Sequence, residues 1–248
     1  MDPTKAAVAS GVVVLAVGTG YGVSALLNNG MPDYSARQKP DPSDGKYVSN
    51  YPDYFVNADD NSNDPWWDWV YKERYSAQAQ ISPGKMFEGV ASGSEGENSV
   101  KAKCKDAYDK ENGEISIPVA EEGSKYSEVD IWRYCSAVSK KPMGISSSEK
   151  YNEGTYGKEN EGKLVAINDV SNDSFWQEQQ RLFFKSGEGR SGSQATEGNI
   201  FKNLWDSKKG NLKDTCKLAY ETEKKTDDSA ESFKKDLFKF CSLKGTES

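Results

Sequence analysis

The stretch that decides the fold is IWRYCS at residues 131–136, because it returns as LFKFCS at residues 237–242. All six positions are identical or conservatively replaced, at a separation of 106 residues. Apolar residues within the first copy have helical spacing, since Tyr134 and Cys135 follow Ile131 by three and four positions. The pair of stretches therefore predicts two related helices, each ending in a cysteine.

Two further blocks repeat in the same order along the chain. The residues of the middle block match at a separation of 112: Val100, Cys104, Lys105, Ala107 and Tyr108 against Leu212, Cys216, Lys217, Ala219 and Tyr220. The remaining block is DPWW at residues 64–67 against DSFW at residues 173–176, each followed by further aromatic residues. Three blocks in one order predict two copies of a structural unit.

Each copy is predicted to contain about three helices, an estimate that follows from the apolar periodicity of its blocks. The first helix is aromatic, the middle helix carries one cysteine and the last helix carries the other. Ser127 and Asp130 have the spacing of a capping box before the last helix of the first copy, and Asp228 and Glu231 take that role in the second. The fold class is therefore mainly α: two related small helical units stapled by cysteine pairs, behind an N-terminal transmembrane helix.

Composition divides the chain into five segments. Polar, Pro-, Asn- and Ser-rich stretches without periodicity are typical of linkers. The segments are an N-terminal transmembrane anchor at 1–30, a polar stalk at 31–63, a helical unit at 64–140, a linker at 141–171 and a second helical unit at 172–248.

Residues 6–27, AAVASGVVVLAVGTGYGVSALL, contain no charged residue. A helix of this length spans about 30 Å, the thickness of the hydrocarbon core of a bilayer. The segment predicts a signal-anchor helix in the lipid bilayer, with a cleaved signal peptide or a buried core helix as alternatives. Cleavage is disfavoured because the stretch is long for a signal peptide and lacks a small-x-small exit.

The four cysteines lie one in each matched helix, which favours Cys104–Cys135 and Cys216–Cys241 among three possible pairings. The alternative is four reduced core cysteines in a reducing compartment. A metal site fits less well, because the chain has no CxxC spacing and no histidine. Disulfides belong to oxidising compartments, so the pairing predicts that the bulk of the chain is extracellular. Charges flanking the apolar segment do not choose a side by themselves.

Composition excludes several kinds of chemistry. The net charge of −7 is unfavourable for a nucleic-acid partner, whose affinity depends on clustered Lys and Arg. The absence of histidine excludes catalytic triads that require it, and no cofactor or metal is predicted. Among 39 acidic residues no carboxylate pair stands out. Trp66, Trp67 and Trp69 could form a stacking platform for a ligand, but their spacing favours Trp66 and Trp67 as core anchors and leaves Trp69 partly exposed.

An apolar N-terminal span, a polar stalk and helical units ending in WRYCS at 132–136 and FKFCS at 238–242 form the layout of the chain. This layout resembles the large paralogous families of hypothetical membrane-anchored proteins of haemotropic mycoplasmas. The resemblance implies a surface-exposed protein that contacts host cells or varies under immune pressure. It carries over no functional residues.

The expected function is that of a non-enzymatic, single-pass surface protein of the cell membrane. Its expected partners are the lipid bilayer, through residues 6–27, and a host or cell-surface protein. Two alternatives remain from the sequence: a membrane-tethered hydrolase that uses carboxylates, and a cytoplasm-facing scaffold with reduced cysteines. No catalytic residue is predicted.

Overall fold

The structure is a computed structural model, and it is mainly helical with two disulfides, as the sequence predicts. It describes residues 30–37, 44–51, 53–77, 82–117, 125–187, 189–224, 226–227 and 229–247. Within these ranges, no helix combines the length and the apolar composition needed to cross a bilayer. The anchor expected at residues 6–27 lies outside the described residues.

The first half of the structure, residues 31–138, is called unit 1. Its helices are α2 (Asp64–Val70), which continues as a π-helix (Tyr71–Ser76), α3 (Val100–Tyr108) and α4 (Glu128–Cys135). A short parallel pair, β1 (Ile115–Ser116) and β2 (Tyr126–Ser127), precedes α4. Short 3-10 turns cover Tyr47–Asn50, Asn61–Asn63, Lys85–Phe87 and Asn112–Glu114.

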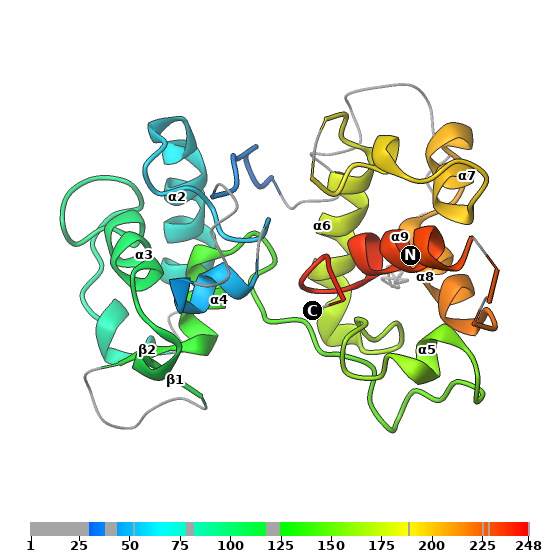
Figure 1. Ribbon diagram of the computed structural model, residues 1–248. Helices are drawn as coiled ribbons and strands as arrows, with labels where there is room; N and C mark the ends of the chain where they lie inside the picture. Colours follow the sequence, from blue (N-terminus) through cyan, green and yellow to red (C-terminus); the bar gives the residue numbers. More distant parts are fainter. Residues whose placement is uncertain are drawn as a thin grey trace, which may run out of the picture.

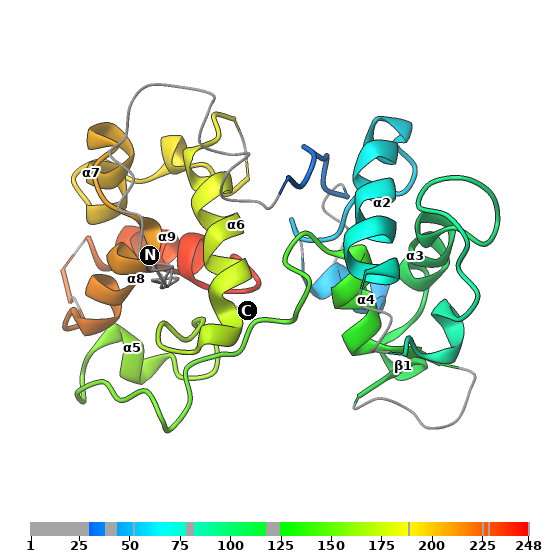
Figure 2. The same ribbon diagram turned by 180° about the vertical axis from the view of Figure 1, so that it is seen from behind.

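The second half, residues 142–247, is called unit 2. Its helices are α5 (Tyr156–Glu159), α6 (Asp173–Phe184), α7 (Ile200–Ser207), α8 (Leu212–Glu221) and α9 (Ala230–Cys241). 3-10 turns cover Val170–Asn172 and Gly192–Gln194. Figure 1 shows the two units side by side, with α2 and α6 on the sides that face each other; Figure 2 shows the same arrangement from behind.

The middle helices of the two units begin at matched capping residues. The Ser99 side chain accepts a hydrogen bond from the backbone N–H of Ala102 at the start of α3. The Asn211 side chain accepts one from Asp214 at the start of α8. Side-chain oxygens at this position satisfy an N–H that the helix itself leaves unpaired. The polar residue before each apolar periodic stretch therefore sets where the helix begins.

The stretch expected to be a polar stalk, 31–63, is instead part of unit 1 wherever the structure describes it. Tyr54, Phe55 and Val56 are almost completely buried, and Val56 pairs with Ala36 in an antiparallel bridge. Such isolated bridges bury side chains without producing a helical or strand period in the sequence. The stalk prediction is therefore corrected: unit 1 begins near residue 31.

The linker expected at 141–171 is corrected for the same reason. Tyr156, Leu164 and Val165 belong to the core, and Val165 pairs with Gly144 in an antiparallel bridge. The two bridges stand at matched positions, because Val165 lies 109 residues after Val56 and Gly144 lies 108 after Ala36. Each unit thus includes about 30 residues before its first long helix, a length read from the matched bridges.

The predicted capping box before α4 is not formed. Ser127 is the N-cap residue but makes no side-chain cap bond, and the Asp130 carboxylate accepts from the N–H of Gly84 at 2.8 Å instead. Burial raises the pKa of Asp130, which that N–H and Arg133 partly offset. In unit 2, Asp228 lies outside the described residues, and Asp236 accepts from the N–H of Thr196. Both aspartates bind a distant loop rather than their own helix end.

The units differ in what joins the first long helix to the cysteine-bearing pair. Unit 2 contains α7, whereas the corresponding stretch of unit 1 has the 3-10 turn Lys85–Phe87. In the described part of the chain, the β1–β2 pair occurs only in unit 1. The separation between matched blocks is 109 residues for the aromatic block, 112 for the middle block and 106 for the last block. The different connecting segments account for these changes in separation.

Candidate functional site

The four cysteines form the two predicted disulfides. Cys104 of α3 is bonded to Cys135 of α4 with a Cα–Cα distance of 5.5 Å. Cys216 of α8 is bonded to Cys241 of α9 with a Cα–Cα distance of 5.8 Å. All four side chains are fully buried. Each bond ties the middle helix of a unit to its last helix, which confirms the expected pairing.

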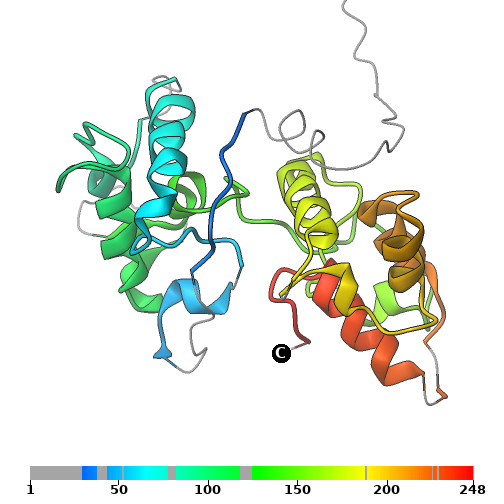
Figure 3. The ribbon, with the colours of Figure 1, turned by 90° about the horizontal axis from the view of Figure 1, so that it is seen from above.

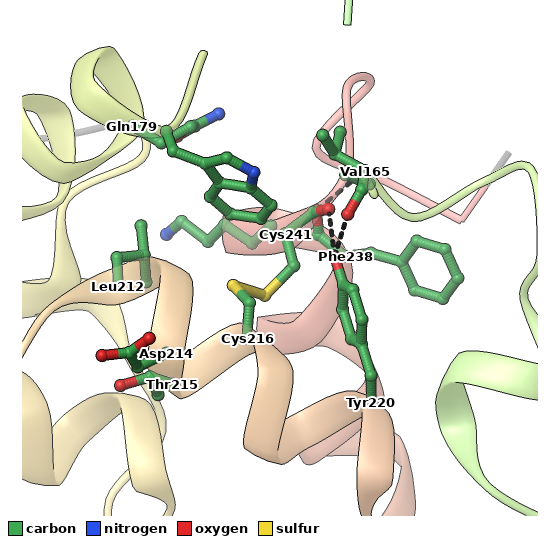
Figure 4. Close-up of a disulfide and its surroundings, with 12 residues drawn as sticks. Val165, Gln179, Leu212, Asp214, Thr215, Cys216, Tyr220, Phe238 and Cys241 are labelled. Atoms are coloured by element: carbon green, nitrogen blue, oxygen red, sulfur yellow. Dashed lines mark hydrogen bonds between the residues drawn. A yellow bond between two sulfur atoms is a disulfide. The ribbon is translucent and has the colours of Figure 1, made fainter. Parts of the chain in front are cut away.

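A tyrosine beside each disulfide makes the same pair of bonds in both units. The Tyr108 hydroxyl lies within hydrogen-bonding distance of the carbonyl oxygens of Val56, at 2.9 Å, and Cys135, at 3.0 Å. Figure 4 shows the equivalent in unit 2, where the Tyr220 hydroxyl meets the carbonyls of Val165 and Cys241. Burial holds the pKa of both tyrosines well above its usual range. Each of the two hydroxyls stays protonated. It links the carbonyl at the end of the last helix to the carbonyl of the valine in the isolated β-bridge, Val56 or Val165.

Replacing Tyr108 or Tyr220 by phenylalanine is expected to lower the free energy of unfolding by about 1 to 2 kcal/mol, because a buried carbonyl loses its donor. Chemical denaturation of each single variant measures this loss. Tyr71→Phe is the control, since Tyr71 is only half buried and its ring stacks on Tyr75 rather than on either of these tyrosines. An unchanged midpoint in Tyr108→Phe and Tyr220→Phe would mean that the hydroxyls add no stability.

An arginine closes the C-terminal end of the last helix in each unit. The Arg74 guanidinium donates to the carbonyls of Arg133, Ser136 and Ala137 at 2.6 to 3.0 Å. Burial lowers the pKa of Arg74 to about 10. In unit 2 the same three carbonyl positions receive Arg190, at 2.7 to 3.2 Å. Carbonyls in the last turn of a helix and just beyond its end have no N–H of that helix to pair with, so a buried cation with several donors stabilises them.

Repeat comparison alone would have missed the two arginines. Arg74 and Arg190 are separated by 116 residues, a spacing that no repeat block shares, and they sit on different local structures. Arg74 lies at the end of the π-helix, whereas Arg190 follows α6 in a loop. The acceptors do follow the repeat, since residues 133, 136 and 137 match 239, 242 and 243 at 106.

One buried asparagine in each unit also holds that unit together, and the sequence carries a signal for both. The Asn63 side chain bonds to backbone atoms of Ser35 and Asn57. The Asn172 side chain bonds in the same way to Met143 and Ala166. The pattern D-x-S-N-D ends at 64 in one copy and at 173 in the other, directly upstream of the aromatic block. Extending that block by four residues locates both.

The tryptophans behave as core anchors. Trp66 and Trp67 are fully buried, and Trp69 is partly buried, as their spacing predicts. The Arg74 guanidinium lies 4.8 Å from the centre of the Trp69 ring. One face of the Trp69 ring is thus covered by an internal cation. Trp205 of α7 is partly buried and packs against the core, and the Lys208 ammonium lies 2.9 Å from the centre of its ring.

Each buried carboxylate accepts hydrogen bonds from its own set of donors within the fold. Glu149 accepts from the N–H groups of Ile167 and Asn168. Asp130 binds Gly84, Asp236 binds Thr196 and Asn199, and Glu178 binds Tyr34 and Arg181: these are four separate sets of partners. Within the described ranges, no group of three or more acidic, cysteine or histidine side chains is placed to hold a metal ion.

A buried ion pair lies between the two units. Glu178 of α6 is almost completely buried and accepts from the Tyr34 hydroxyl of unit 1. Arg181, one turn further along α6, binds the same carboxylate through two nitrogens at 2.6 and 2.9 Å. Its guanidinium also lies 5.0 Å from the centre of the Tyr34 ring and 3.5 Å from Asp33.

A second group of contacts joins the units through Tyr54. Its hydroxyl accepts a bond from Gln179, and its ring lies 5.9 Å from that of Phe175. Arg190 lies over the same ring and pairs with the Asp53 carboxylate at 3.0 Å. Both groups are formed by α6 and the loop after it on one side and by the early part of unit 1 on the other.

A scan against protein-family models, a search of curated proteins and a search of solved structures each found no match.

Proposed function

We propose that this chain is a non-enzymatic, membrane-anchored surface protein whose two disulfide-stapled units are displayed outside the cell. The observation that carries the proposal is that all four cysteines are paired, one bond in each unit, with no free thiol among the described residues. Disulfides persist in oxidising compartments and are rare in the cytosol of most organisms. A cytoplasmic scaffold with reduced thiols is correspondingly less compatible with these pairs.

Two further observations support a binding or display role over a hydrolytic one. The buried carboxylates each serve a separate structural contact, rather than converging as paired acid and base groups would. The net charge of −7 suits a soluble exterior more than a nucleic-acid surface. The partner we propose is a host or cell-surface protein, as the resemblance implies.

The corrected start of unit 1 sharpens this proposal. Only residues 28 and 29 separate the apolar segment 6–27 from Gly30, where the described structure begins. Met31 already contacts the buried Arg74 through its sulfur. If the apolar segment spans the bilayer, the folded units stand close to the membrane surface rather than at the end of a stalk.

Protease treatment of intact cells is expected to digest the region after residue 30 and to leave the N-terminal segment in the membrane. The measurement is immunoblotting with tags placed at each end of the full chain. Cells opened by detergent serve as the control that the protease can cut the protein. Complete protection on intact cells, together with digestion after opening, would rule out surface display.

Thiol counting tests the compartment independently. Alkylation of freshly isolated, denatured protein should modify none of the four cysteines before reduction and all four afterwards, as read by mass spectrometry. Four reactive thiols before reduction would contradict an oxidising compartment and would restore the cytoplasmic scaffold.

A further inference from the structure

Residues 31–37, called the strap, run between the two units; Figures 1 and 3 show them in blue between α2 and α6. The strap is paired to unit 1 by its backbone. The N–H of Arg37 donates to the carbonyl of Phe55 at 2.8 Å, and the N–H of Asn57 donates to that of Ser35 at 3.0 Å. These bonds make the strap an edge of unit 1.

The side chains of the strap reach the other unit. Tyr34 is almost completely buried, and its hydroxyl donates to Glu178 of α6. Burial and the adjacent carboxylate hold the pKa of Tyr34 well above its usual range, so it remains a donor. The centre of the Tyr34 ring lies 6.0 Å from that of the Trp66 ring of unit 1 and 5.0 Å from the Arg181 guanidinium of unit 2. One side chain thus contacts both units.

The repeat provides an internal control for what the strap does. In unit 2 the equivalent segment makes the same backbone bonds, with the N–H of Ala166 donating to the carbonyl of Met143. The position equivalent to Tyr34 is Pro142, which carries no donor, and the position equivalent to Glu178 is Trp69. A unit therefore needs the backbone pairing but not the tyrosine–glutamate bond.

We infer that the strap holds the two units in one relative orientation, and that Tyr34 is the residue whose contact with Glu178 fixes this orientation. Glu178 supports this role, because a buried carboxylate is stable only while its donors stay in place. Arg181 supplies one set of donors from α6 itself, whereas Tyr34 is supplied by unit 1. Withdrawal of Tyr34 exposes this side of the interface to water and leaves the Tyr54 contacts and the hydrogen bond from Ser174 to the Val138 carbonyl to hold the units.

The inference is independent of which compartment holds the protein, and it concerns positioning rather than binding. It predicts that the relative orientation of the units depends on a hydroxyl group, that of Tyr34, which neither unit needs for its own fold. The first described segment after residues 6–27 is therefore also the segment that sets the relative orientation of the two units.

The test is single-molecule energy transfer on the full chain, with dyes on unnatural amino acids at the exposed positions Lys105 of α3 and Lys217 of α8. The unaltered chain should give one distance population. Tyr34→Phe removes only the hydroxyl, and it should raise the share of a second, longer-distance population by about tenfold or more, the factor expected for a lost bond to a buried charge.

The control is Tyr47→Phe, which also removes a tyrosine–glutamate bond but within unit 1, where the Tyr47 hydroxyl donates to Glu128 and accepts from the Trp132 indole N–H. It should lower the melting temperature and leave the distance population unchanged. The inference is overturned if Tyr34→Phe keeps the single wild-type population, whether or not its melting temperature falls. It is also overturned if Tyr47→Phe produces the same second population, because the effect would then reflect loss of unit 1 stability.

Discussion

Replacing Cys216 and Cys241 together by alanine is expected to lower the free energy of unfolding by about 3 to 4 kcal/mol on the chain-entropy model. The bond spans 25 residues, and without it the unfolded chain regains the freedom that the closed loop removes. The same double replacement at Cys104 and Cys135, which span 31 residues, should cost slightly more. Denaturant titration of both double variants measures the two losses.

The two disulfides also provide each other's control. Each double variant leaves the other bond intact, so a loss confined to one unit should appear as earlier unfolding of that unit alone. Hydrogen exchange across α8 and α9, compared with α3 and α4, separates the two cases. Equal midpoints for the intact and the fully reduced protein would show that the bonds do not stabilise the fold.

Replacing Arg74 or Arg190 by methionine is expected to cost at least about 3 kcal/mol, because three carbonyl groups lose a charged donor in a buried place. Methionine fills much of the volume, so the loss reports on the hydrogen bonds more than on a cavity. Thermal and denaturant unfolding measure it. The Arg190 variant should lose more of the inter-unit contact, since Arg190 also pairs with Asp53 at 3.0 Å.

A lysine at either position separates charge from geometry. Arg74→Lys keeps a cation but offers a single nitrogen in place of the planar fork that reaches three carbonyls. We expect it to recover only part of the stability that Arg74→Met loses. Full recovery would show that the charge alone matters and that the three-way geometry is incidental.

The mainly helical fold and the disulfide pairing were predictable because they leave periodic or countable signals. Cysteines at matched positions on apolar stripes point to one pairing. The segments before α2 and α6 were misjudged, because isolated bridges such as Ala36 to Val56 bury residues without any period. A run of Pro, Asp and Asn predicts a linker, although Asn63 within it is buried and its side chain bonds to the backbone of two other segments.

The contacts between the units were beyond sequence reasoning for a different reason. Tyr34 and Glu178 are separated by 144 positions, and the equivalent positions of the other unit hold Pro142 and Trp69, so neither periodicity nor internal comparison relates the pair. The charge on Glu178 would ordinarily predict an exposed helix position. Only the packing of α6 against the strap makes that carboxylate buried, and this packing depends on both units being folded.

Arg74 and Arg190 bear on the history of the duplication as well as on stability. The acceptors of both arginines are carbonyl groups at repeat-equivalent positions, yet the donors come from positions that are not equivalent. If the halves descend from one ancestor, the requirement was inherited while the residue that meets it was replaced. Distant relatives of this chain are therefore expected to share the backbone geometry at the end of the last helix, while the arginine that binds it can come from different positions.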